Sequence, residues 1–147
     1  MKKTWLLALL CAALAFTLAA CGGGGAKAKN YAPGTYTGQS SENEDGDYAI
    51  ATVTIGEDNK ITDIEFVSYE KNGNIKDENY GKQDGEIANQ DYFNRAQNAV
   101  AAMQKYADQF LEVQDLAKLD AITGATLSYD QFNESVSIAL SKAEQEL

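Results

Sequence analysis

The first half of the chain after residue 30 alternates apolar and polar positions with the period of a β-strand. Tyr48–Ile55 is rich in β-branched residues and fairly apolar on both faces, which is typical of an interior strand. The polar residues 56–60 have the length and composition of a hairpin loop, and 61–69 return with apolar residues on one face and acidic residues on the other. A short candidate strand bounded by glycines, Gly34–Gly38, precedes this hairpin.

The second half changes to a helical period. Residues 91–113 are expected to form one helix with an apolar stripe, which contains Phe93, Ala96, Val100, Met103, Ala107, Phe110 and Leu111. A final helix is expected from Tyr129 to Glu146, with Ser128 as its N-cap and Gln131 completing a capping box. Its buried face is expected to contain Phe132, Val136, Ala139, Leu140 and Ala143.

A polar connection, residues 70–90, separates the two halves and is long for a compact domain. Three readings stay open for it: a functional lid, an excursion or local disorder. The pattern as a whole predicts an α+β fold, in which a small antiparallel sheet, begun by an N-terminal hairpin, packs with two C-terminal helices.

The N-terminus has the three zones of a secretory signal. Lys2 and Lys3 precede an apolar stretch at 5–17, which is short for a membrane span. Leu18-Ala19-Ala20-Cys21 then resembles the processing site of bacterial lipoproteins. The resemblance implies a cleaved signal peptide at 1–20 and a Cys21 that carries lipid, with the two or three acyl chains needed for stable retention.

Residues 21–30 contain four consecutive glycines and are expected to act as a flexible tether for a single domain at 31–147. This places the domain on the extracytoplasmic face of the cell membrane, held by a lipid anchor. The alternative is an uncleaved single-span anchor, which leaves the domain on the same side.

Charge and composition narrow the function classes. Without residues 1–20 the chain keeps 10 basic and 22 acidic residues, a net charge of −12, which disfavours nucleic acid and anionic lipid headgroups as partners. Cys11 leaves with the signal peptide and Cys21 is the lipid acceptor, so the domain has no thiol, and the chain has no histidine. Thiol nucleophiles, Ser-His machinery and the usual zinc sites are thereby disfavoured, and no catalytic or metal-binding residue is expected.

The most specific motif is Asp120-Ala-Ile-Thr123-Gly124-Ala125-Thr126, which lies just before the final helical pattern. It resembles the acceptor motif of the FMN-binding domain family, in which a flavin transferase esterifies the FMN phosphate onto the last threonine. The opening Gly-x-Tyr-x-Gly of 34–38 resembles that family more weakly. The exported part of the chain, including residues 71–80 and the acceptor motif, also resembles small lipoproteins known as membrane immunogens.

The resemblance implies a redox carrier with covalent FMN on Thr126 rather than an enzyme with its own substrate. Thr123 takes the small hydroxyl position, Gly124 permits a positive φ, and Gly124 and Ala125 leave room for the phosphate. Asp120 is expected to fix the loop or to bind a metal in the transferase complex. The implied partners are the flavin transferase and a membrane redox protein, and the ring contacts are sought among Tyr69, Tyr80, Tyr92 and Tyr129.

Other readings remain open at this point. Thr-Gly-Ala-Thr forms turns readily, so the motif is also compatible with a loop that merely enters a helix. FMN could be bound without a covalent bond, or the chain could be a surface-exposed structural or antigenic lipoprotein without flavin. A solute-binding lipoprotein is disfavoured, because one domain of this size cannot form a two-lobed cleft.

Overall fold

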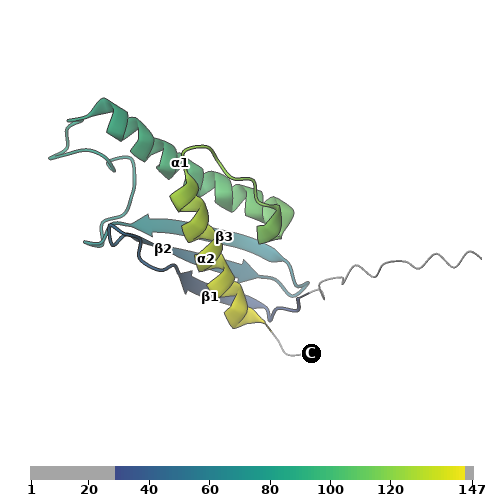
Figure 1. Ribbon diagram of the computed structural model, residues 1–147. Coiled ribbons are helices and arrows are strands. Elements are labelled where there is room, and N and C mark those ends of the chain that lie inside the picture. The colour runs from purple at the N-terminus through teal and green to yellow at the C-terminus, as the bar shows by residue number, and fades with distance from the viewer. Residues whose placement is uncertain (1–28, 145–147) are drawn as a thin grey trace, which may run out of the picture.

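The computed structural model of the chain describes residues 29–144 (Figure 1). Its elements are, in order, β1 (Gly34–Gln39), β2 (Tyr48–Ile55), β3 (Ile61–Tyr69), α1 (Gln90–Val113), the 3-10 turn η1 (Leu116–Lys118) and α2 (Thr126–Ala143). This arrangement confirms the predicted α+β class. The expected signal peptide, Cys21 and the glycine tether lie outside the described residues. In the part of the chain described, no helix has both the length and the apolar character required to cross a membrane.

The three strands form one antiparallel sheet in the order β1-β2-β3, so the interior position predicted for β2 is confirmed. Val53 of β2 pairs with Tyr36 on one side and with Ile64 on the other. The apolar residues of β2 that face the helices, Ala49, Ala51 and Val53, are completely buried. Small side chains on a central strand let the helices approach the sheet closely.

Both helices pack on this face of the sheet. In Figure 1, α2 crosses in front of β1 and β2, whereas α1 runs along the β3 side. Phe132 of α2 lies at their junction, with its ring centroid 4.9 Å from that of Phe66 and 5.9 Å from that of Phe110. Burying a side chain of this kind stabilises a fold by roughly 1.5–3 kcal/mol, so this aromatic cluster fixes the two helices against β3.

Helix α1 agrees with its prediction to within one residue at its start. The side chain of Asn89 accepts a hydrogen bond from the backbone N–H of Tyr92 at 2.9 Å, and the helix ends where Gln114 adopts a left-handed conformation. The predicted stripe faces the core, but Tyr106 is also completely buried and was not predicted to be.

The predicted start of the final helix is wrong. Helix α2 begins at Thr126 instead of Tyr129, and Ala125 is its N-cap residue. Ser128 and Gln131 do not form a capping box, because both side chains are buried in the interior of the fold. The Gln131 amide is committed elsewhere: it donates to the carbonyl of Asp47 at 3.1 Å and accepts from the hydroxyl of Ser68 at 3.4 Å.

The end of α2 also differs, since the helix ends at Ala143 and Glu144 bridges to Tyr31. The predicted last residue, Glu146, lies outside the described residues. Its predicted buried face is confirmed, because all five of its residues are at least nine-tenths buried.

The long connection between β3 and α1 is an ordered excursion, and we call residues 70–89 the strap. Lys76 donates its backbone N–H to the carbonyl of Ser68 at 2.9 Å, which fastens the strap to the end of β3. Farther along, the side chain of Gln97 in α1 donates to the carbonyl of Tyr80 at 2.8 Å. The strap therefore returns to the domain at two places before α1 begins.

Candidate functional site

The predicted acceptor motif forms a tight turn that leads directly into α2. The N–H of Ala125 donates to the carbonyl of Ile122 at 3.0 Å and closes the turn. Gly124 has a φ of +79°, a left-handed conformation that strains other residues, so the positive φ expected there is confirmed. Asn98 of α1 braces the turn by donating its side-chain N–H to the carbonyl of Thr123 at 3.2 Å.

Tyr106 fixes the same turn from inside the protein. Its hydroxyl accepts a hydrogen bond from the N–H of Ile122 at 2.9 Å and lies 3.4 Å from the carbonyl of Ala125, to which it donates. Both ends of the turn are thus attached to one buried side chain of α1. Nothing in the local sequence of α1 indicated this role.

Thr126 is the first residue of α2 and is exposed. The backbone N–H groups in the first turn of a helix have no partner within the helix and create a partial positive charge. At the start of α1, the Asn89 side chain accepts a hydrogen bond from one of these N–H groups, and the negative charge of Asp91 offsets the partial positive charge. At α2 no side chain caps the helix and no acidic residue occupies the first turn, so this helix start is suited to an anion.

The other predicted site residues lie around Thr126 in different settings. Thr123 and Gly124 are exposed. Ala125 is only 3% exposed, so its methyl group packs in the core beneath the turn. Asp120 is exposed and makes no hydrogen bond or ion pair with another described residue. Cys21, the predicted lipidation site, lies outside the described residues.

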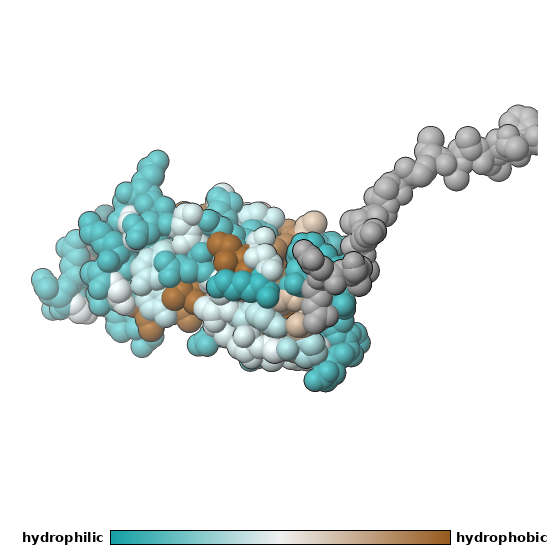
Figure 2. Space-filling model, turned by 90° about the horizontal axis from the view of Figure 1, so that it is seen from below, coloured by the Kyte–Doolittle hydropathy of each residue, from teal (hydrophilic) through white to brown (hydrophobic). Residues whose placement is uncertain are grey.

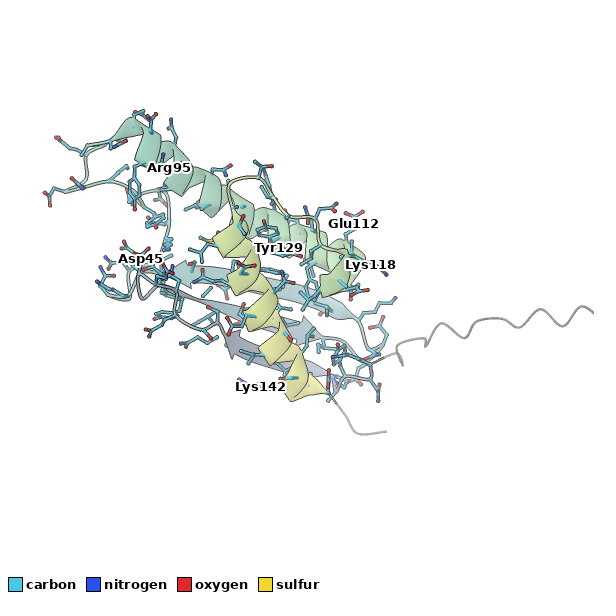
Figure 3. All side chains as sticks on the ribbon, in the orientation of Figure 1. Asp45, Arg95, Glu112, Lys118, Tyr129 and Lys142 are labelled. Atoms are coloured by element: carbon cyan, nitrogen blue, oxygen red, sulfur yellow. The ribbon has the colours of Figure 1, made fainter. Side chains whose placement is uncertain are left out.

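The four tyrosines considered as ring contacts are dispersed. Tyr69 stacks on Tyr48 with ring centroids 5.1 Å apart, on the face of the sheet that points away from the helices. Tyr129 lies on α2 one turn after Thr126 (Figure 3), half-buried with its ring 5.6 Å from that of Tyr106. Residues three apart on a helix are neighbours, so Tyr129 is the candidate nearest to the acceptor along α2.

Tyr80 and Tyr92 lie together on the strap and at the start of α1. Their side chains lie close enough for each to affect the pKa of the other. Burial raises the pKa of Tyr80 above its usual value, and the side-chain interaction with Tyr80 is the main cause of the raised pKa of Tyr92. Tyr92 is 45% exposed, so this pair presents aromatic surface to solvent.

A buried ion pair between Asp47 and Lys76 was missed by the sequence analysis. The Lys76 ammonium lies 2.6 Å from a carboxylate oxygen of Asp47, and the two side chains are 5% and 11% exposed. The carboxylate also accepts from the N–H of Lys71 at 3.2 Å. Charged residues are expected at the surface unless they are paired, and a pairing between segments this far apart has no local signal in the sequence.

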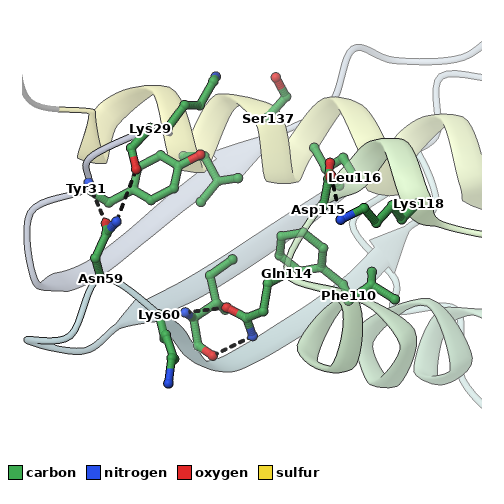
Figure 4. A pocket seen from close by; sticks show the side chains of 13 residues that line it. Lys29, Tyr31, Asn59, Lys60, Phe110, Gln114, Asp115, Leu116, Lys118 and Ser137 are labelled. Carbon is green, nitrogen blue, oxygen red and sulfur yellow. Dashed lines mark hydrogen bonds and ion pairs between the residues drawn. The ribbon is translucent and has the colours of Figure 1, made fainter. Parts of the chain in front are cut away.

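A cavity lies at the other end of α2 (Figure 4). Its volume is about 640 Å³, and its lining includes Tyr31, Phe110, Leu116, Ser137 and Leu140. Ser137 follows Thr126 by eleven residues, a rise of about 16 Å along the helix. The three lysines at its rim are each paired with a carboxylate, so the cavity offers little net attraction for a phosphate.

Comparison with known families decides which chemistry this geometry serves. Residues 48–141 match the model of the FMN-binding domain family, a segment that runs from the start of β2 almost to the end of α2 and contains the whole acceptor turn. The chain belongs to the FMN-binding domain family. No curated protein and no solved structure gave a significant match.

FMN is accordingly the cofactor of this FMN-binding domain, and the residues present are compatible with its phosphate. An uncapped helix start without a carboxylate offers backbone N–H donors, and the exposed residue Thr126 carries a hydroxyl at the same point. The flavin supplies the redox chemistry when it is bound, while the protein supplies its position, its surroundings and the electrostatic field.

Proposed function

We propose that this FMN-binding domain carries its FMN as a phosphoester on Thr126 and acts as a lipid-anchored, extracytoplasmic electron carrier. The observation that supports the attachment point most directly is the contrast between the two helix starts. The start of α1 has a side-chain cap, Asn89, and an acidic residue, Asp91. The start of α2 has neither a side-chain cap nor an acidic residue, and its first residue is Thr126. In a protein of net charge −10, such a site is a local exception to an otherwise repulsive field.

The attachment needs one bond. The hydroxyl oxygen of Thr126 becomes bonded to the phosphorus of the flavin phosphate, the bond from that phosphorus to an oxygen leaving group breaks, and the leaving group departs with the hydroxyl proton. The protein therefore gains the mass of FMN less one water. Asn98 and Tyr106 keep the turn before Thr126 in one shape. Once the bond is formed, the N–H groups in the first turn of α2 remain available to the phosphate oxygens.

The carrier role rests on the sequence features at the N-terminus together with the cofactor. A lipidated Cys21 and a glycine tether would keep the domain at the membrane surface and let it move between an electron donor and an acceptor. The face shown in Figure 2 is mainly hydrophilic, with hydrophobic residues in small separate patches. Such a surface favours brief electrostatic encounters with a membrane redox partner over a permanent interface.

The test of attachment is the intact mass of the domain coexpressed with a flavin transferase, compared with Thr126→Val and Thr123→Val. We expect the wild type and Thr123→Val to gain one FMN less one water, because both keep the hydroxyl at position 126. Thr126→Val should remain unmodified and lose the bound yellow colour after denaturation.

Two outcomes would contradict the proposal. Unmodified but yellow wild-type protein would show that FMN is held without a covalent bond. Unmodified, colourless wild-type protein would favour a structural or antigenic lipoprotein that has lost its flavin.

A further inference from the structure

The Asp47–Lys76 ion pair connects the strap with the sheet and with α2. One carboxylate oxygen of Asp47 binds the Lys76 ammonium at 2.6 Å, and the other accepts from the N–H of Lys71 at 3.2 Å. The backbone carbonyl of the same Asp47 accepts from Gln131 at 3.1 Å. Gln131 follows Thr126 by five residues, so this contact lies about 7.5 Å along α2 from the acceptor.

A second route leads from the ion pair to the acceptor turn through α1. The Lys76 ammonium lies 4.7 Å from the ring centroid of Tyr80. The carbonyl of Tyr80 is held by Gln97, and the next residue of α1, Asn98, holds the carbonyl of Thr123. The ion pair, the strap and the acceptor turn therefore form one continuous set of contacts.

The exposed large apolar side chains lie on the same segments that carry these contacts. In the described part of the chain, the exposed large hydrophobic residues are Ile75, Ile87, Tyr92 and Leu127. Two lie on the strap, Tyr92 is in the first turn of α1, and Leu127 directly follows the acceptor threonine. Exposed apolar side chains on neighbouring segments are typical of binding sites, and the flat flavin ring needs apolar surface to pack against.

We infer that the Asp47–Lys76 ion pair is a positioning element for the flavin ring. It fastens the strap so that Tyr80 and Tyr92 form one wall of the ring site, and it places two opposite buried charges within the electrostatic reach of the ring. This inference rests on the proposed attachment of FMN to Thr126. It assigns the ring to the strap side of α2 rather than to the cavity at the other end of the helix.

Two buried charges of opposite sign make a specific test possible. Reduction adds negative charge to a flavin, so a nearby positive charge raises its midpoint potential and a nearby negative charge lowers it. Lys76→Met leaves the Asp47 carboxylate unbalanced, whereas Asp47→Asn leaves the Lys76 ammonium unbalanced. Buried charges are little screened by salt, so both effects should persist at high ionic strength.

The measurement is the midpoint potential of the flavin-loaded protein in these two variants, in the double variant Asp47→Asn/Lys76→Met, and in Lys60→Met as a surface control. We expect Lys76→Met to lower the potential and Asp47→Asn to raise it. The double variant and Lys60→Met should remain close to the wild type, and Lys76→Arg should restore most of the wild-type value.

Hydrogen exchange of the unloaded protein tests the strap without any flavin. We expect amide exchange in residues 70–89 to become about tenfold faster in Lys76→Met, with smaller changes in the double variant. If Lys76→Met does not fold, Lys76→Gln and Tyr92→Phe serve in its place. Tyr92→Phe removes the Tyr92 hydroxyl, and with it the interaction with Tyr80, and leaves the ion pair intact.

Equal shifts of the potential in the same direction, or no shift in either single variant, would overturn the inference while leaving the attachment at Thr126 intact. A larger effect from Ser137→Leu in the distant cavity than from Lys76→Met would overturn it as well. A wild-type protein that gains no FMN would contradict the proposed function itself. The inference would be contradicted separately if amide exchange in residues 70–89 were unchanged in Lys76→Met.

Discussion

The hydroxyl oxygen of Tyr106 lies 2.9 Å from the backbone nitrogen of Ile122, so a completely buried side chain in the middle of α1 fixes the start of the acceptor turn. Removing this hydroxyl leaves a part-buried backbone N–H without its acceptor. The turn in front of the predicted attachment point therefore depends on a residue that is distant from it in the sequence.

We expect Tyr106→Phe to lower the free energy of unfolding by about 1–2 kcal/mol, the usual cost of an unsatisfied buried donor. Urea unfolding followed by circular dichroism measures this. Tyr129→Phe is the control, because the Tyr129 hydroxyl makes no hydrogen bond to another described residue and its loss should change stability little. An equal loss in both variants would contradict the role given to Tyr106.

The left-handed conformation of Gly124 leads to a second prediction. At the φ of +79°, an alanine would lower the free energy of unfolding by about 1–2 kcal/mol relative to glycine. Its Cβ would lie 3.1 Å from the side-chain nitrogen of Asn98. Gly73→Ala has a similar φ of +86° but no atom within 4 Å of the added Cβ. We expect both variants to be destabilised, but only Gly124→Ala to gain FMN more slowly, as followed by mass spectrometry. Equally fast loading in both would show that the shape of the turn is not required.

Helix α2 approaches the sheet very closely at Gly38. A Cβ at this position would lie 2.0 Å from the carbonyl oxygen of Ser135 and 2.6 Å from the backbone nitrogen of Ala139. Backbone atoms of a helix cannot move aside singly, so we expect Gly38→Ala to destabilise the fold by about 3 kcal/mol or more. Thermal unfolding checks this against Thr37→Ala on the neighbouring exposed position. A Gly38→Ala variant of wild-type stability would show that α2 packs differently.

The tyrosine pair of the strap predicts a dependence on alkaline pH. Burial raises the pKa of Tyr80 in the folded state above its usual value of 10.0, so the unfolded chain loses this proton first as the pH rises. Stability should therefore be constant below about pH 10 and fall above it. Tyr80→Phe should make this fall less steep. Unfolding midpoints measured across pH 8–11 test the prediction, and identical slopes in both proteins would refute it.

Local pattern was sufficient to predict the strands and α1. The alternation in Tyr48–Ile55 and the helical stripe of α1 each depend on neighbouring residues, and the structure places both elements within one residue of their predicted bounds. The start of α2 was misjudged because Gln131, which looks like part of a capping box, is recruited by Asp47 instead. Hydrogen bonds between distant segments leave no periodic trace in the sequence.

In the candidate site, too, features set by neighbouring residues could be predicted, whereas contacts between distant segments could not. The positive φ of Gly124 and the exposed position of Thr126 could be anticipated from the motif, because both residues belong to one short turn. The supporting residues could not, because Tyr106, Asn98 and Lys76 reach the site from other elements of the fold. That the methyl group of Ala125 packs in the core could not be anticipated either, because the residues that cover it come from other elements.

The most direct test of the account is to locate the flavin on the chain. Trypsin cleaves after Lys118 and next after Lys142, so one peptide contains Thr123, Thr126 and Ser128 together. Fragmentation of this peptide by tandem mass spectrometry, after coexpression with a flavin transferase, identifies which hydroxyl carries the added mass. The account predicts FMN less one water on Thr126 alone. The same mass on Thr123 or Ser128, or its absence from the peptide, would contradict it.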